Sequence, residues 1–370
     1  MGSHMEALEE DNLAYILSLL DTPRDLSSAS CVCSLWHEIV VKDGFWRTMC
    51  IKQFPELGNY FRCLSSSGNL GTLSEASLHK CSSPSRKNDA GSVYMSLLKS
   101  LLEPPIQRTC IAEPLHASST DNLPTESIAQ TLFPKPQYTD EHSYSYWSSK
   151  GESNVDVPEM LTYRLVSDIC VVHSIKIQPF LAFFQSGHPI YSAKMVRFRF
   201  GYPRIKKRHW SGLFQSLVAH RSQKASMDDY VWTYVSPEFP MRQENILQTF
   251  ELPRPTVCIG GILQVEFMGR EQTQSSDNLY YICISHVYVS GRPILGFKLE
   301  NMLTNQKVLL RQLTEEDKGS LSNQQSLDPF IEMINGVVQG IHDPLVDNLL
   351  WYLYSAGLLH DLREDEVESE

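Results

Sequence analysis

The chain has 370 residues, of which 42% are hydrophobic and 20% charged, and its formal net charge is −11. This length predicts two or three domains, and the apolar content excludes a wholly disordered chain. An acidic chain is not a general nucleic-acid binder, because phosphate contacts need clustered Lys and Arg. No apolar run approaches the roughly 20 residues that cross a bilayer. We therefore expect neither nucleic acid nor a membrane as a partner.

The ends of the chain and its cysteines suggest where the protein works. The first residues, Met-Gly-Ser-His-Met, are typical of an expression-vector remnant. The nine cysteines show no C-x-x-C spacing, which disfavours a zinc site or a redox pair. Without a visible secretory leader, small buried thiols in a reducing compartment are expected. The sequence therefore predicts a nuclear or cytoplasmic protein with no metal and no cofactor.

Changes in composition divide the chain into segments. The expected segments are the expression remnant (1–5), a helical module with its linker (6–61), a disordered Ser-rich insertion (62–92), a linker helix with a Pro-rich connector (93–143), a β-sandwich (144–296), C-terminal helices (297–360) and an acidic tail (361–370). Within 144–296, short alternating and β-branched runs such as Val196–Phe200 predict strands with no helices between them. The fold class is therefore α+β multidomain, with an antiparallel sandwich or jelly roll between two helical regions.

The helical module has a clear apolar stripe. Leu13, Ile16, Leu17 and Leu20 are spaced at i, i+3, i+4 and i+7, which is one face of a helix. Thr22-Pro23 then predicts a capped start of a second helix, with Pro at the first helical position. These helices are too few to bury their own apolar faces. The surplus apolar surface must contact the rest of the chain or a partner.

Several motifs in this module resemble the F-box family, in its plant type. They are Ile16–Asp21, Asp25-Leu26, Val32-Cys33 followed by Trp36, and Phe45-Trp46. The resemblance implies that the module docks a Skp-family adaptor, and through it a cullin, in an SCF ubiquitin ligase, while the rest of the chain holds a protein substrate. The side chains expected at the adaptor are Leu8, Leu13, Ile16, Leu17, Leu20, Leu26, Cys33, Trp36 and Trp46. The alternative is that they form the core of an ordinary helical domain.

The order of motifs in the β region resembles the galactose-binding-like jelly roll, as in discoidin domains. The segments that carry this resemblance are 145–152, 158–165, 172–177 and 284–290. Such domains bind through loops gathered at one end of the barrel, because rigid strands hold variable loops. The candidate loops here are 148–157, 184–193, 201–228 and 268–278. Another type of β-sandwich is the alternative.

One stretch of the β region, Lys194–Trp210, is basic and contains no acid. Its predicted loop supplies the candidate substrate-binding residues, which are Arg204, Lys206, Lys207, Arg208 and Trp210. Such a loop suits an acidic or phosphorylated peptide, because Lys and Arg make charge-assisted hydrogen bonds to anions. A nuclear-import signal and a solvated face that balances nearby acids are the alternatives.

No catalytic signature is visible. His37-Glu38 lacks the second histidine of H-E-x-x-H, and there is no G-x-S-x-G elbow. We therefore expect a non-catalytic subunit of a ubiquitin ligase complex. The alternative function is a carbohydrate- or anion-binding sandwich whose N-terminal helices are only structural, and co-purification with a Skp adaptor distinguishes the two.

Overall fold

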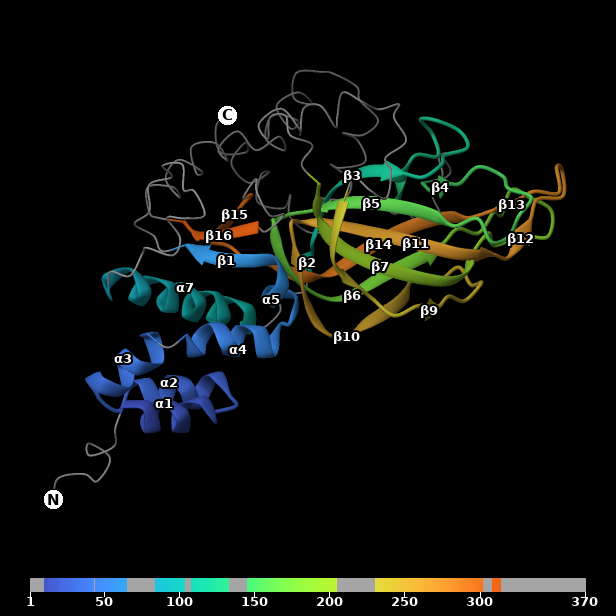
Figure 1. Ribbon diagram of the computed structural model, residues 1–370. Coiled ribbons are helices and arrows are strands. Elements are labelled where there is room, and N and C mark those ends of the chain that lie inside the picture. The colour runs from blue at the N-terminus through green and yellow to red at the C-terminus, as the bar shows by residue number, and fades with distance from the viewer. Residues whose placement is uncertain are drawn as a thin grey trace, which may run out of the picture.

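The computed structural model places a group of helices against one end of a β-sandwich (Figure 1). It describes residues 10–42, 44–64, 84–103, 108–132, 145–204, 230–301 and 308–313. Among the described helices, none combines the length and the apolar character needed to cross a membrane.

The N-terminal helices form where the sequence predicts them. They are α1 (Glu10–Ser18), α2 (Pro23–Ser30), α3 (Ser34–Lys42), α4 (Phe45–Gln53) and α5 (Glu56–Tyr60). Helix α2 begins as expected, because the Thr22 side chain accepts a hydrogen bond from the Asp25 backbone N–H at 3.1 Å and Pro23 follows the cap. Leu13 and Leu17 of the predicted stripe are fully buried.

Helix α7 (Pro84–Leu102) is longer than the helix expected in the 93–143 segment. Its first nine residues belong to the segment 62–92, which we expected to be disordered, and β1 (Phe61–Leu64) begins in the preceding module and occupies the start of that segment. The polar composition concealed the start of the helix, although Pro is well suited to the first helical position. The rest of the expected insertion, 65–83, lies outside the described residues.

Two mainly antiparallel sheets face each other. One contains β10 (Gln248–Ile259), β6 (Ile169–Pro179), β14 (Cys283–Pro293) and β2 (Arg108–Thr109) in that order, with β4 (Trp147–Ser148) also paired to β14. The other contains β3 (Ile111–Ala117), β5 (Glu159–Leu165), β11 (Ile262–Arg270), β7 (Ala193–Pro203) and β8 (Tyr230–Val235), with β9 (Phe239–Pro240) paired to β7. A short hairpin, β12 (Gln272–Thr273) and β13 (Tyr280–Tyr281), extends from one end.

The Pro-rich connector, which we expected to precede the sandwich, is part of it. Its residues form β2, β3 and the 3₁₀ helix η1 (Ile128–Leu132). Strand β2 pairs with β14 and β3 pairs with β5, so the sandwich starts at 108 and not at 144. Pro114 is tolerated because β3 is the edge strand of its sheet, and a register shift of the ladder adjoins that position.

The segment after the sandwich begins with strands, where we expected helices from 297 onward. Strands β15 (Phe297–Asn301) and β16 (Val308–Gln312) form a three-stranded sheet with β1, in the order β1-β16-β15. A long-range partner decided this outcome, since β16 pairs in parallel with β1 from the far end of the sequence. The two helices predicted at 327–341 and 345–359, and the acidic tail, lie outside the described residues.

Two apolar cores hold the molecule together. The first fills the space between the two sheets and includes Val265, Phe198, Ile175 and Val289. The second joins the helices to one end of the sandwich, because Trp46, Leu57 and Leu97 share a cluster with Ile259 and other strand residues. We call this the helix-facing end of the sandwich and the opposite one the distal end (Figure 1).

Two local contacts fix the helices in place. Arg254 of β10 forms two hydrogen bonds with the carboxylate of Glu56 on α5, at 2.6 and 3.3 Å, and Glu56 is buried. Helix α7 approaches α3 so closely at Gly91 that a Cβ there would lie 2.4 Å from the Val41 carbonyl oxygen. The predicted fold class is therefore confirmed in its N-terminal helices and its central antiparallel sandwich.

Candidate functional site

The two ends of the molecule differ in what they expose. Strand β6 runs between them: Ile169 lies in the apolar cluster shared with the helices, and Phe180, just after the strand, lines a pocket at the distal end. An eleven-residue strand spans roughly 35 Å at about 3.3 Å per residue. The helices and the pocket are thus separated by the length of the sandwich.

Helices α1 and α3, with the turns beside them, carry large apolar side chains that are exposed. We call these residues the apolar F-box patch: Tyr15 (68% exposed), Ile16 (41%), Leu19 (61%), Val32 (62%) and Leu35 (39%). Tyr15 and Leu19 are four residues apart and so lie on one face of α1 and its end. Exposed apolar groups that gather in one region of a protein mark an interaction surface.

The side chains predicted to meet the adaptor fall into different environments. Those buried in the helical core are Leu13, Leu17, Leu26 and Trp46. Leu20 and Trp36 are half-buried against the same core, whereas Ile16 and Cys33 are exposed. Leu8 lies outside the described residues. The buried members support the surface from beneath and do not themselves reach a partner.

Four members of the apolar F-box patch were missed in the sequence: Tyr15, Leu19, Val32 and Leu35. A signal was present, because Tyr15 and Leu19 form a second apolar pair with helical spacing beside the buried stripe of Leu13 and Leu17. A helix that carries two apolar stripes buries one in its own domain and leaves the other for a partner.

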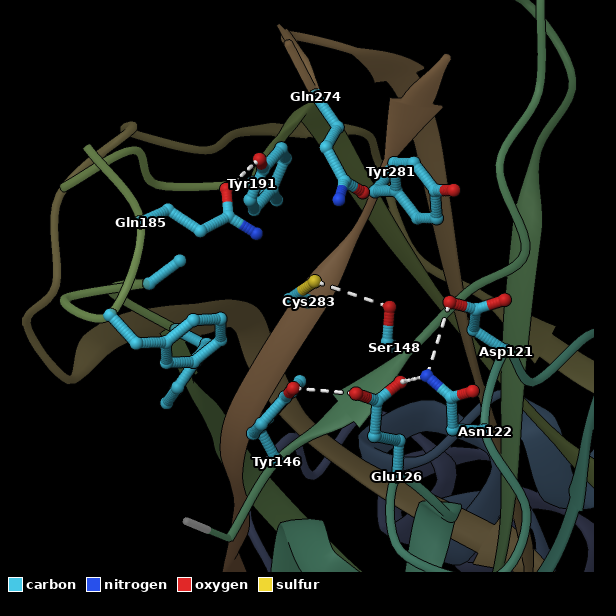
Figure 2. Close-up of a pocket in the computed structure, with 13 residues that line it drawn as sticks. Asp121, Asn122, Glu126, Tyr146, Ser148, Gln185, Tyr191, Gln274, Tyr281 and Cys283 are labelled. Carbon is cyan, nitrogen blue, oxygen red and sulfur yellow. Dashed lines mark hydrogen bonds between the residues drawn. The ribbon is translucent and has the colours of Figure 1, made fainter. Parts of the chain in front are cut away.

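The distal end holds a pocket of about 230 Å³, shown in Figure 2. We call it the distal pocket. The residues that line it are Asp121, Asn122, Glu126, Tyr146, Ser148, Phe180, Ala182, Phe184, Gln185, Tyr191, Gln274, Tyr281 and Cys283. They come from the segment before η1, from β4, from the loop between β6 and β7, and from the β12–β13 hairpin with the start of β14. Strand ends thus converge on it from both sheets.

A hydrogen-bonded chain of acids and amides forms one wall of the distal pocket (Figure 2). The Asn122 side chain donates to Asp121 at 3.3 Å and to Glu126 at 3.2 Å. The Tyr146 hydroxyl donates to Glu126 at 2.6 Å. Burial raises the pKa of Asp121, and repulsion from Glu126 and Asp277 raises it further, against a smaller opposing effect of Lys150. This wall is electrostatically negative.

Aromatic rings form the remaining walls. Tyr146 and Phe180 stack with their centroids 3.9 Å apart, and Tyr191 meets Tyr281 edge to face at 6.0 Å. Phe184 stands at the mouth with 53% of its surface exposed. Burial raises the pKa of Tyr146, as does its bond to Glu126, so this phenol stays protonated and continues to donate.

The Cys283 thiol lies at the floor of the pocket and is chemically quiet. Its Sγ donates to the Ser148 hydroxyl oxygen at 3.4 Å, and burial raises its pKa to about 12. A thiol, not a thiolate, is therefore present at neutral pH, and it is a poor nucleophile. Within the described residues, no group of three or more His, Cys, Asp and Glu side chains is placed to hold a metal ion.

A buried ion pair holds the loops behind the pocket. The Arg270 guanidinium donates to the Glu159 carboxylate at 2.6 Å and also to Ser149 Oγ and the Tyr280 carbonyl oxygen, at 3.0 and 2.9 Å. Both charged side chains are almost fully buried. Since Ser149 and Tyr280 neighbour the lining residues Ser148 and Tyr281, this pair fixes the position of two strands that shape the pocket.

Part of this site was predicted from the sequence. The candidate loops 148–157, 184–193 and 268–278 each contribute lining residues to the distal pocket, among them Ser148, Phe184 and Gln274. The acidic wall was missed, because its residues, 121–126, lie in the Pro-rich connector, which we expected to precede the β-sandwich. Their polar, turn-rich composition gave no signal that strand β3 would bring them to the end of the sandwich.

The described part of the basic stretch Lys194–Trp210 follows strand β7 away from the distal pocket. Arg197 and Arg199 both bond to Glu266 of β11, at 2.7 and 2.8 Å, and Arg197 also bonds to Glu238 at 3.3 Å, so two acids on the sheet balance these two cations. Arg204 is exposed just beyond β7, and Pro203 pairs with Tyr230 at the helix-facing end. The ends of β7 and β8 on either side of this loop therefore lie at the end opposite the distal pocket. Lys206, Lys207, Arg208 and Trp210 lie outside the described residues.

The helical end matches a known protein class. The F-box-like family model matches residues 10–52, which are the helices α1–α4 less the last residue of α4. An F-box protein of Arabidopsis thaliana is 41% identical over 312 residues, covering 84% of this chain and 82% of that protein. The chain therefore belongs to the F-box protein family.

The β-sandwich also has similar solved structures. A family 32 carbohydrate-binding module of Clostridium perfringens NanJ, in complex with galactose, covers 48% of this chain and 98% of its own, with 12% identity and a TM-score of 0.28. A fucolectin from striped bass serum covers 50% of this chain and 47% of its own, with 13% identity and a TM-score of 0.26. Both TM-scores are below 0.5, and it is the pairing of its strands that defines the sandwich.

Proposed function

We propose that this protein is the substrate-recognition subunit of an SCF-type cullin–RING ubiquitin ligase. In this proposal its first helices dock a Skp-family adaptor and its β-sandwich holds a protein substrate. Membership of the F-box family supports the general role. The apolar F-box patch is the observation that carries the docking, because five large apolar side chains stand exposed on helices α1 and α3 and in the turns beside them.

The energetics of the patch favour a partner. Burying a Leu, Ile or Val side chain contributes about 1.5–3 kcal/mol relative to leaving it in water. A few such side chains therefore supply a large share of a specific interface, whereas Leu13 and Leu17 beneath them are already buried and add nothing on binding. A charge placed within the patch removes this gain and must itself lose its water on docking.

The arrangement of the two ends suits a receptor. The helices are joined to the sandwich through a continuous apolar cluster and through the Glu56–Arg254 pair. A firm joint holds a substrate at a defined distance from the adaptor, which is what transfer of ubiquitin to that substrate needs. We further propose that the subunit is non-catalytic and acts in the nucleus, the cytoplasm or both.

The test is capture of a Skp-type adaptor by the full chain. We expect a stable complex with the wild type and loss of capture with Ile16→Asp combined with Leu19→Asp. The matched control is Leu247→Asp, because Leu247 is 43% exposed, close to the 41% of Ile16, but lies on the sandwich before β10. The control should bind like the wild type.

Two results would contradict the proposal. One is undiminished capture by the doubly substituted chain when circular dichroism shows it folded. The other is a wild-type chain that stays monomeric beside the adaptor, which would favour the alternative of a carbohydrate- or anion-binding sandwich with structural helices. The acidic or phosphorylated substrate predicted from the basic loop remains a prediction, tested by reversing Lys206, Lys207 and Arg208 to Glu and measuring substrate capture.

A further inference from the structure

We propose that the distal pocket binds a basic side chain, Arg or Lys, presented by the protein substrate. The identity of the occupant as part of a substrate rests on the proposed function. The chemistry of the pocket, however, is a property of this chain, and it can be measured without the adaptor.

The shape of the pocket limits the size of its occupant. At about 230 Å³ it is smaller than the ~300–1,000 Å³ of sites that enclose a drug-sized ligand. One side chain or one small ring fits such a space. The Phe184 ring at its mouth is 53% exposed. A side chain that a protein substrate inserts into the pocket can therefore also make an apolar contact with this ring.

The charge of the pocket determines the sign of the occupant. Asp121 and Glu126 line it, and Asp277 lies behind its Tyr281 wall, where its carboxylate accepts a hydrogen bond from the Tyr281 hydroxyl at 2.7 Å. No Lys, Arg or His is among the described residues that line the pocket. The raised pKa of Asp121 reflects burial first and then this concentration of like charge. A bound cation would relieve the repulsion.

The hydrogen bonds of the wall also favour an occupant that donates. The amide N–H groups of Asn122 are directed at Asp121 and Glu126, and the hydroxyl of Tyr146 is directed at Glu126 (Figure 2). Each carboxylate oxygen has two lone pairs, so these oxygens retain acceptor capacity after those bonds are made. Guanidinium and ammonium groups are pure donors and match this wall.

The aromatic walls complete the match. A cation within about 6 Å of an aromatic ring centre is attracted by the ring quadrupole, and Arg stacks on such rings. The hydrocarbon stem of Arg or Lys needs an apolar surface as well, which Phe180, Phe184 and Tyr191 supply. The acids can thus bind the charged head group of a long basic side chain, and the aromatic rings can contact its hydrocarbon stem.

The experiment compares charged and uncharged ligands of the same shape on the full chain. The probes are Nα-acetyl-arginine methylamide, Nα-acetyl-lysine methylamide, the uncharged isostere Nα-acetyl-citrulline methylamide, and galactose, and binding is followed by saturation-transfer NMR. We expect the arginine or lysine probe to bind at least about tenfold more tightly than citrulline, as a charge-assisted contact predicts.

Three substitutions locate the binding. Glu126→Gln removes the charge yet keeps an acceptor for Tyr146, and it should weaken the cationic probe about tenfold. Phe184→Ala should weaken both the cationic probes and citrulline, because it removes an apolar contact and no charge. The matched control is Glu251→Gln on β10, outside the pocket, and it should leave binding unchanged.

The outcomes separate this inference from the proposed function. Equal binding of arginine and citrulline, binding of galactose in preference to the basic probes, or no binding by any basic probe would each overturn the inference. So would a Glu126→Gln chain that is folded and binds the arginine probe undiminished. None of these results would bear on whether the chain captures the adaptor. Conversely, failure of adaptor capture with intact, Glu126-dependent arginine binding would overturn the proposed function and leave the basic-side-chain pocket standing.

Discussion

The two ends of the sandwich are held by different physics. At the helix-facing end, apolar side chains from α4, α5 and α7 pack against strand residues, and the joint is closed. At the distal end, the buried Arg270–Glu159 pair and its hydrogen bonds hold the strands, and a pocket stays open beside them. Apolar packing fills space, whereas a polar network can fix loops in place around a space that is left empty. Apolar packing therefore suits a joint, and a polar network suits a binding site.

The largest expected effect is loss of the polar clamp at the distal end. Arg270→Met leaves the Glu159 carboxylate buried with no cation, and breaking such a pair costs about 3–5 kcal/mol. Urea unfolding should show this loss. The matched control, Arg242→Met, removes an exposed arginine paired with Glu244 at 3.1 Å, and it should cost no more than about 1 kcal/mol.

If Arg270→Met and Arg242→Met lower the free energy of unfolding equally, the ion pair does not hold the distal end. The two ends would then not differ in what stabilises them. The Arg270→Met chain should also lose binding in the distal pocket before it loses adaptor capture, because Arg270 contacts Ser149 and Tyr280 beside the pocket and lies a strand length away from the helices.

The second effect tests the apolar joint. Leu57 of α5 is 2% exposed in the cluster that links the helices to the sandwich. Leu57→Ala should lower the free energy of unfolding by about 2–5 kcal/mol, since it leaves a cavity. Leu295→Ala, at a site 76% exposed, is the control and should change it little. A small cost for Leu57→Ala would mean that this joint is loosely packed.

The third effect measures the Glu56–Arg254 ion pair at the joint. Arg254→Met leaves Glu56 uncompensated, but the Arg254 side chain is 40% exposed and water can take its place. The cost should therefore lie near 1–3 kcal/mol, below that of Arg270→Met. Adding Glu56→Gln removes the stranded charge, and a double-mutant cycle should show recovery of part of the loss. Strictly additive costs would show that the two side chains do not interact in solution.

Local patterns predicted those parts of the structure that depend on near neighbours. The alternation of Val196–Phe200 placed Val196, Phe198 and Phe200 in the core, as the structure confirms. The cap at Thr22 and the buried stripe of α1 are likewise local features. The F-box motifs identified the family, because their spacing is short and specific.

Long-range pairing produced what the sequence did not predict. Residues 297–301 and 308–312 are strands because β1, from the other end of the described chain, pairs with β16. The acids of the distal pocket reach it only because β3 pairs with β5, and no local pattern records that pairing. The exposed members of the apolar F-box patch were overlooked because a helical stripe alone does not reveal which of its faces is buried.

The smallest expected effect concerns a histidine on β14, in the sheet between the two ends. The His286 ring is partly buried, and burial favours its neutral form. Its Nδ1 lies 2.9 Å from the Thr131 carbonyl oxygen of η1. Burial lowers the pKa of His286, and the bond to Thr131 opposes this only in part. The unfolded chain then binds a proton more readily than the folded one. Stability is therefore full above the ordinary histidine pKa of about 6.5 and falls as the pH drops through the lowered value.

The matched substitution is His286→Asn, whose side-chain amide reproduces the bond to Thr131 without a titratable ring. The comparison runs from about pH 7.5 to about pH 5.5, on either side of the ordinary histidine pKa of about 6.5. Over this range the free energy of unfolding should fall more for the wild type than for this variant. The difference should be the smallest of these effects, because a single titrating side chain produces it. Burial also lowers the pKa of His116 and of His173, so the variant keeps part of the slope. Parallel curves for the two chains would show that His286 takes up its proton in the folded state as easily as in the unfolded one, and that the sheet beside η1 is open to water.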